Sequence, residues 1–70
     1  MTISIDAWAD GPDSSGRWRG CWRLIRNGAA IRGRFGVTAD YFTSEALAVT
    51  AALRCGTSDK RNVPGDDMFR

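Results

Sequence analysis

The sequence predicts an α+β domain in which a three-stranded antiparallel sheet is followed by one helix packed on its tryptophan-rich face. Three observations predict this β-β-β-α order. A segment with two-residue alternation starts at Ile3, an Asn27-Gly28 dipeptide separates two further alternating segments, and an alanine-rich segment after Thr43 has helical periodicity. Seventy residues hold one domain, and 43% apolar residues with three tryptophans supply a small core.

The first predicted strand runs from Ile3 to Ala9. Its odd-numbered residues are apolar, and the opposite side carries Ser4, Asp6, Trp8 and Asp10. Residues 11–16 are all glycine, proline, serine or aspartate, which favour turns. We therefore expect a mobile surface loop after the first strand.

The strongest local signal is Asn27-Gly28, which suits a type I′ turn because both central residues of that turn need positive φ. It predicts a hairpin with strands at residues 17–26 and 29–37. A two-residue turn also fixes the register of the two strands. The expected cross-strand pairs are Arg26 with Ala29, Leu24 with Ile31, Trp22 with Gly33, Gly20 with Phe35, and Trp18 with Val37.

In that register the hairpin has one apolar face and one basic face, because side chains alternate across a strand. The apolar face holds Trp18, Trp22, Leu24, Ile31, Phe35 and Val37. The other face holds Arg17, Arg19, Cys21, Arg23, Ile25, Arg32 and Arg34. We expect the first face to form the core and the second to meet solvent or a partner.

After a short loop at residues 39–41, the helix is expected to begin with Thr43 as N-cap and Glu45 in the first turn, where the helix dipole favours an anion. It runs to about Cys55, and Gly56 takes the C′ position that ends it. The helical spacing predicts a stripe that faces the sheet. Its members are Ala46, Val49, Thr50 and Leu53.

The other side of this helix carries small residues where a solvated helix usually carries Lys and Glu. They are Ala48, Ala51, Ala52 and Cys55. Two interpretations remain open. Alanine is a strong helix former by itself, and small residues also allow close contact in a homodimer or in the groove of a partner.

The predicted domain spans residues 1–56, and residues 57–70 form a polar tail with a Pro64-Gly65 turn. Met68 and Phe69 are the two large apolar residues of this tail that could dock back on the core.

The basic residues are nine Arg and a single Lys, although the net charge is only +2. The predicted register sets Arg23 opposite Arg32, and like charges that face each other across strands need a counter-charge. Asp6 and Asp10 could supply it, or an external anion could, either a phosphate backbone or an acidic protein surface. Trp8 lies on the same side and could stack on a base or a side chain. The candidate partner-binding residues are Arg17, Arg19, Arg23, Arg32, Arg34 and Trp8.

The residue inventory excludes several classes of catalyst. The chain has no His, and Cys21 and Cys55 lack the spacing of metal ligands, which excludes zinc fingers and histidine-based catalysis. We therefore expect no enzyme activity, no metal and no cofactor. The arginines around Cys21 are expected to lower the pKa of its thiol. No apolar segment reaches the roughly 20 residues of a membrane span, and no signal peptide is recognisable, so we expect a cytoplasmic protein.

The segment from Ile3 to Leu53 resembles the opening βββα unit of ribonuclease H, with an Asp on the first strand, a glycine-containing turn, a hairpin, and Glu45 near the start of an alanine- and leucine-rich helix. The resemblance implies an acidic metal site with Asp6, Asp10 and Glu45. That family also requires a carboxylate on a fourth strand, and residues 57–70 have no strand pattern.

The order of elements, the aromatic hairpin strands and the Thr43-Ser44-Glu45 helix start resemble small phage and mobile-element proteins of anti-CRISPR type. Domains of double-stranded-RNA-binding shape are also similar, but the helix start that is basic in those domains is acidic here. The first resemblance implies a non-enzymatic inhibitor in the host cytoplasm that docks on a protein or ribonucleoprotein complex through the arginine face. A nucleic-acid-binding module that uses the same face is the alternative, and a ribonuclease-H-like remnant is the second alternative.

Overall fold

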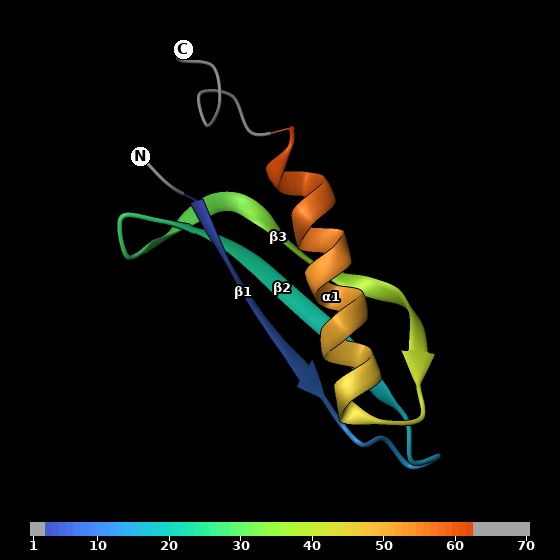
Figure 1. Ribbon diagram of the computed structural model, residues 1–70. Helices are drawn as coiled ribbons and strands as arrows, with labels where there is room; N and C mark the ends of the chain where they lie inside the picture. The colour runs from blue at the N-terminus through green and yellow to red at the C-terminus, as the bar shows by residue number, and fades with distance from the viewer. Residues whose placement is uncertain (1–2, 63–70) are drawn as a thin grey trace.

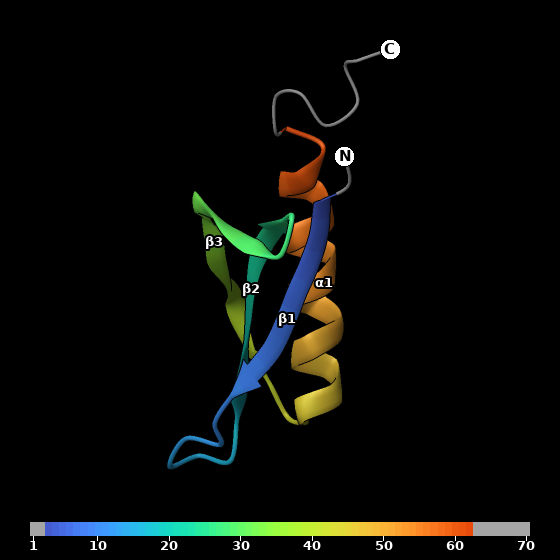
Figure 2. The same cartoon turned by 90° about the vertical axis from the view of Figure 1, so that its left-hand side faces the viewer.

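Three antiparallel strands form one sheet in the order β1-β2-β3, and a single helix crosses one face of it (Figure 1). The computed structural model describes residues 3–62. Its elements are β1 (Ile3–Asp10), β2 (Trp18–Arg26), β3 (Ala29–Phe42) and α1 (Glu45–Lys60). After a quarter turn, α1 is seen to lie on one side of the sheet only (Figure 2). The predicted fold class and the β-β-β-α order are confirmed.

The β1–β2 pair is regular along its whole length. Eight consecutive pairs join the two strands, from Ile3 opposite Arg26 to Asp10 opposite Arg19, without a register shift. Because side chains alternate, the even-numbered residues of β1 share one face of the sheet with the odd-numbered residues of β2. This confirms that the acidic side of the first strand lies beside the basic side of the second.

Asp13 organises the loop between β1 and β2. Its Oδ1 accepts hydrogen bonds from the backbone N–H groups of Arg17, at 2.9 Å, and Ser15, at 2.8 Å. Both bonds favour the charged carboxylate and hold the pKa of Asp13 below its ordinary value. The bond from Arg17 has the larger effect and the bond from Ser15 the smaller.

The turn between β2 and β3 forms where the sequence predicts it. Asn27 and Gly28 have φ angles of 54° and 79°, as a type I′ turn requires. Arg26 lies opposite Ala29. The predicted turn and the first predicted pair are therefore confirmed.

The predicted register fails further along this hairpin. The next pairs are Ile25 with Ala30 and then Arg23 with Phe35. Four residues of β3, 31–34, therefore lie opposite the single residue Leu24 of β2. A regular ladder would have one residue there, so this segment, called the excursion, contains three extra residues. Gly33 lies within it and has a φ angle of 77°, which a residue with a side chain rarely adopts. The wrong pairs are Leu24 with Ile31, Trp22 with Gly33, Gly20 with Phe35, and Trp18 with Val37.

The excursion changes which side chains of β3 face the helix. Three extra residues are an odd number, and a shift by an odd number moves every later side chain to the other face of the sheet. Phe35 and Val37, expected in the core, instead lie opposite Arg23 and Cys21 on the face away from α1. The predicted apolar face is wrong at these two positions.

A second irregularity lies opposite Gly20. Cys21 pairs with Val37 and Arg19 with Tyr41, so residues 38–40 stand against one residue of β2. The buried Thr38 hydroxyl accepts a hydrogen bond from the Gly20 N–H at 3.1 Å and donates one to the Asp40 carbonyl at 2.8 Å. The side chain of Thr38 thus replaces the interrupted ladder, and residues 39–41, expected as a loop, belong to β3.

The helix is longer than expected and starts one residue later. Ser44, not Thr43, is the N-cap, and its Oγ accepts a hydrogen bond from the Leu47 N–H at 3.2 Å. The helix continues past Cys55 to Lys60, and Gly56 is a buried residue within it. Both predicted ends of the helix are wrong, and residues 57–60 of the expected tail are helical.

The helix packs on the sheet with its small residues. Ala48, Ala52 and Gly56 are buried, whereas the residues Ala46, Thr50 and Leu53 of the stripe predicted to face the sheet are exposed. A Cβ atom at Gly20 would collide with the carbonyl oxygen of Ala48. This contact means that the backbone of α1 lies directly on the backbone of β2. Ala48 and Ala52 are covered by the sheet, so the homodimer surface predicted on them is wrong.

Large side chains fill the space beside this close contact. Ile3 and Leu24 are fully buried, and the partly buried residues that pack against them are Ile5, Trp22 and Ile31. The tail positions Met68 and Phe69 lie outside the described residues.

Candidate binding face of the sheet

The face of the sheet away from α1, called the open face, carries four rows of side chains in register across the strands. The rows are Ser4, Ile25 and Ala30; Asp6, Arg23 and Phe35; Trp8, Cys21 and Val37; and Asp10, Arg19 and Tyr41. Each row takes one residue from each strand, so the open face combines aromatic, apolar and charged groups within a few residue spacings. No element of residues 3–62 covers it (Figure 2).

Four large apolar side chains of the open face are exposed. The exposed fractions are 43% for Trp8, 70% for Phe35, 52% for Val37 and 46% for Tyr41. Cys21 lies between Trp8 and Val37 in its row, and these three residues and Phe35 line a hollow of about 340 Å³. Exposed apolar groups that adjoin one another in this way are typical of contact surfaces, whereas scattered ones are not.

Arg23 is held in place by two neighbours on β1. Its Nε donates to Oδ2 of Asp6 at 2.9 Å, and its guanidinium carbon lies 5.7 Å from the centre of the Trp8 ring. This ion pair confirms the expectation that Asp6 supplies a counter-charge to the arginine face. Because both partners are about half exposed, the pair itself adds little to stability.

Arg19 lies over an aromatic ring of β3. Its guanidinium carbon is 4.7 Å from the centre of the Tyr41 ring, a cation–π distance. Its Nε is buried and has no hydrogen-bond partner among residues 3–62. The carboxylate of Asp10 occupies the neighbouring position of the same row.

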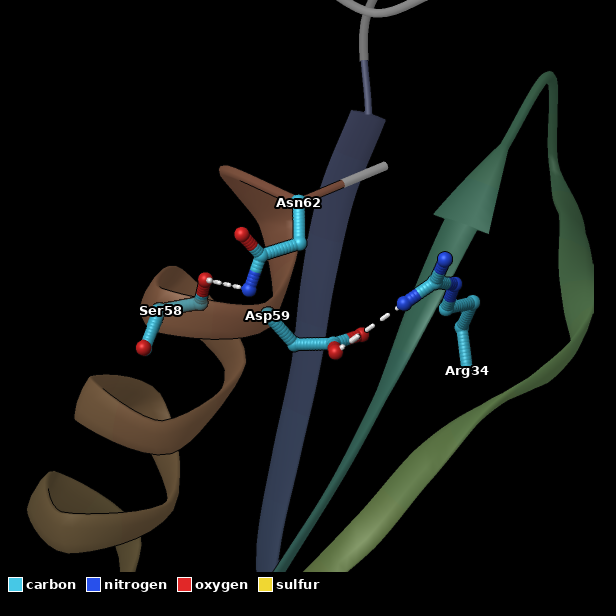
Figure 3. Close-up of polar contacts among 4 residues, drawn as sticks. All are labelled: Arg34, Ser58, Asp59 and Asn62. Carbon is cyan, nitrogen blue, oxygen red and sulfur yellow. Dashed lines mark hydrogen bonds and ion pairs between the residues drawn. The ribbon is translucent and has the colours of Figure 1, made fainter. Parts of the chain in front are cut away.

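The remaining predicted arginines do not join this cluster. Arg34 extends toward α1, where its Nη1 lies 3.2 Å from Oδ1 of Asp59, beside the hydrogen bond from Asn62 to the Ser58 carbonyl (Figure 3). Arg32 is exposed within the excursion, and Phe35 takes the place opposite Arg23 that was predicted for it. Arg17 is exposed in the loop before β2. Of the five predicted arginines, the structure places Arg19 and Arg23 in the rows of the open face and pairs Arg34 with Asp59 of α1.

The environment of Cys21 differs from the expectation. Burial, with a smaller contribution from Asp10, raises the pKa of the Cys21 thiol and outweighs the lowering effect of Arg19. The predicted activation of this thiol by arginines is wrong, because the other arginines point elsewhere or are paired. Cys21 and Cys55 are both free thiols.

The carboxylates implied by the ribonuclease H resemblance do not form a metal site among the described residues. Asp6 is engaged by Arg23, and no group of three or more His, Cys, Asp or Glu side chains suited to a metal ion occurs in residues 3–62. Asp10 and Glu45 do belong to the same end of the molecule, since β1 ends where α1 begins (Figures 1 and 2).

Comparison with protein-family models, with curated proteins and with solved structures finds no match. No helix within residues 3–62 is long and apolar enough to cross a membrane.

Sequence reasoning missed Phe35, Val37 and Tyr41 as residues of the open face. The signal that could have found them is the pair of glycines inside the third strand, because a glycine within a strand often marks a bulge or a close backbone approach. Gly33 has a positive φ angle, and a Cβ atom at Gly36 would come within 2.8 Å of the Trp22 ring.

Proposed function

We propose that this chain is a non-enzymatic binding protein that docks on a partner protein through the open face of its sheet. The observation that carries the proposal is the group of exposed side chains Trp8, Phe35 and Val37 around one hollow, with the exposed Tyr41 on the same face of the sheet. Protein interfaces are enriched in aromatic residues and arginine at their centre, and the open face combines both.

The charges of the open face favour a protein partner over a nucleic acid. Phosphate binding needs unpaired cations, but Arg23 is paired with Asp6, and Arg19 covers the Tyr41 ring with Asp10 beside it. Two carboxylates on the same face repel a phosphate backbone. The two acidic and two basic residues of the open face balance in charge, so the face lacks the net positive charge that attracts a phosphate backbone.

The partner that fits is a protein, free or within a ribonucleoprotein complex, with an apolar surface that can enter the hollow. The resemblance to anti-CRISPR proteins supports an inhibitory role for such a contact. In that role the protein would block a surface that its partner needs for activity, and catalysis by this chain would not be required.

The test begins with the full chain as bait in a nuclease-treated lysate of the native host, and each captured protein is then purified and titrated by calorimetry. Phe35→Ala is expected to weaken the interaction at least tenfold, because Phe35 is the most exposed aromatic residue of the hollow. Leu47→Ala is the matched control, since Leu47 is also half exposed but belongs to α1.

Two results would overturn the proposal. One is a partner whose affinity is the same for the parent chain and for Phe35→Ala. The other is tight binding to generic single-stranded or duplex nucleic acid with a steep loss of affinity as salt rises, which would assign the face to a nucleic acid.

A second candidate function is phosphodiester cleavage of ribonuclease H type. The observation that favours it is the placement of Asp10 at the end of β1 and of Glu45 in the first turn of α1, at one end of the βββα unit (Figure 1). These two carboxylates do not complete a metal site within the described residues. Magnesium-dependent cleavage of the RNA strand of an RNA–DNA hybrid, lost in both Asp10→Asn and Glu45→Gln, is the result this function requires.

A further inference from the structure

The sheet has two edges, and they differ in regularity. The strand order places β1 at one edge and β3 at the other. In an antiparallel sheet alternate residues of an edge strand direct their N–H and C=O groups outward. Among residues 3–62 no strand lies beyond β1, so its outward backbone groups have no ladder to join.

The edge formed by β3 is protected by its irregularities. The two register shifts interrupt its pairing with β2, and the excursion at residues 31–34 contains Gly33 in a left-handed conformation. Arg34 also ties this segment to Asp59 of α1. Bulges and irregular edges are the means by which proteins prevent strand addition.

The edge formed by β1 has none of these protections. Its eight residues pair with β2 without a shift, so its outer side presents a regular hydrogen-bonding edge. The strand contains no Pro, no Gly and no Lys, the residues that commonly block an edge. Regular edges of this kind are the sites at which extended peptides add to a sheet.

We infer that β1 accepts an added strand from a partner polypeptide, and that this strand carries Lys or Arg at alternate positions. The acidic side of β1 determines the charge of the partner. Asp10 has no ion pair among residues 3–62 and is the main attractor of a cation, whereas Asp6 is half exposed but already paired with Arg23. Side chains directly opposite in adjacent strands attract when their charges are opposite, so basic residues would lie next to these two carboxylates.

A second copy of the chain is a poorer occupant of this edge. The only charged residues of β1 are Asp6 and Asp10. Two copies of β1 side by side would bring four carboxylates along one seam, and the Arg23 of each copy offsets only its own Asp6. The charges therefore favour a different polypeptide over self-pairing.

This inference goes beyond the proposed function, because it concerns the edge of the sheet and not the open face. The probe is a capped synthetic heptapeptide in which lysine alternates with valine, titrated into the isotope-labelled full chain. We expect amide chemical-shift changes and slowed hydrogen exchange along β1 at alternate residues. Asp10→Asn is expected to weaken binding a few-fold, since one of two charge contacts is lost.

Two control peptides separate strand addition from charge attraction. A peptide with glutamate in place of lysine is expected to bind at least tenfold more weakly. A lysine peptide whose alternate backbone nitrogens are methylated keeps its charge but cannot form the ladder, and it is expected to lose binding. Equal affinity of the methylated and unmodified peptides would overturn the inference, as would shift changes centred on β3 or self-association through β1 in the absence of peptide.

The variant Phe35→Ala keeps this test separate from that of the proposed function. Phe35 belongs to β3, two strands away from the outer edge of β1. Peptide binding at β1 is therefore expected to be unchanged in this variant. Failure of the open face to bind a partner would leave the edge inference standing, and the reverse also holds.

Discussion

Thr38 connects two strands with one hydroxyl group. It accepts from the Gly20 N–H and donates to the Asp40 carbonyl at the point where three residues of β3 stand against one of β2. A buried backbone group without a partner is costly, and the buried Gly20 N–H depends on the same side chain as the partly buried Asp40 carbonyl. The irregular part of β3 therefore leaves neither the Gly20 N–H nor the Asp40 carbonyl without a hydrogen-bond partner.

Thr38→Val is expected to destabilise the fold by about 1–3 kcal/mol, because it keeps the shape but leaves a donor and an acceptor unpaired. Urea unfolding followed by tryptophan fluorescence measures the effect. Thr57→Val is the control, since Thr57 is exposed and its hydroxyl donates only to the Leu53 carbonyl in the helix. Equal unfolding midpoints for the two variants would contradict the role of Thr38.

The Cys21 thiol is expected to be slow to alkylate. Its pKa is raised, mainly by burial, so the folded chain keeps the proton at pH values where the unfolded chain has lost it. In a Cys55→Ser background, the rate of reaction with iodoacetamide should rise with pH later in the folded than in the urea-unfolded protein. By the same sign, stability falls as the pH rises through the thiol range.

Asp10→Asn is expected to speed this reaction at a given pH, because Asp10 contributes to raising the pKa of Cys21. An unchanged rate would show that Asp10 does not act on the thiol.

Individual residues were predictable where strict alternation held. The sequence predicts that Asp6 lies on the arginine side of the sheet, and the regular register of β1 and β2 then makes Arg23 its partner. The partner of Arg34 was not predictable, because it depends on a shift inside β3 and on a helix that continues to Asp59. Alternation rules assume a regular ladder, and they fail beyond its first interruption.

At the level of the element, α1 packs on the sheet through small residues that bring its backbone close to β2, and not through large apolar side chains. The prediction placed the larger residues of the helix inward, which is the usual pattern for an amphipathic helix. Here Gly20 of β2 lies against the carbonyl of Ala48, and only small residues fit at that distance. The signal for this arrangement lies in two segments at once, the glycine in β2 and the alanines in α1, so no single segment reveals it.

Ser44→Ala is expected to destabilise the protein by about 0.5–2 kcal/mol, because it removes the acceptor for the Leu47 N–H in the first turn. Thermal unfolding by circular dichroism measures the loss. Thr43→Ala is the matched control, and its melting temperature should stay close to that of the parent. If Thr43→Ala lowered the melting temperature more than Ser44→Ala, Thr43 would be the N-cap, as the sequence predicts.

For the whole molecule, the core is small. Within residues 3–62 the fully buried large side chains are Ile3 and Leu24. A chain of this length has a stability of roughly 3–10 kcal/mol if it follows the usual range per residue. The contribution of each buried side chain is therefore a large fraction of the free energy of unfolding.

Leu24→Ala is expected to cost about 2–5 kcal/mol, because Leu24 is fully buried under α1 and its loss leaves a cavity. At the lower end of the stability range this loss unfolds a measurable share of the molecules at 25 °C. Leu53→Ala removes the same side chain from an exposed position of α1 and should cost less than about 1 kcal/mol. Chemical denaturation of both variants checks the difference.

The order of elements and the identity of the helix-bearing face were predictable because they rest on the Asn27-Gly28 turn and on the even-numbered residues of β2. The composition of the open face was not predictable. It depends on how many residues of β3 bulge out between Ala30 and Phe35, and no local pattern encodes that number.

The number of residues in the excursion affects which side chains of β3 lie on the open face of the sheet. A chain with one residue fewer at positions 31–34 would either shorten the excursion and keep Phe35 opposite Arg23, or shift the later alternation by one residue and turn Phe35 and Val37 toward the helix. In the second case, a single-codon insertion or deletion in this segment would replace Phe35 and Val37 on the open face with their sequence neighbours. Among related chains, the number of residues in this segment would be a better guide to shared partners than the percentage of identical residues.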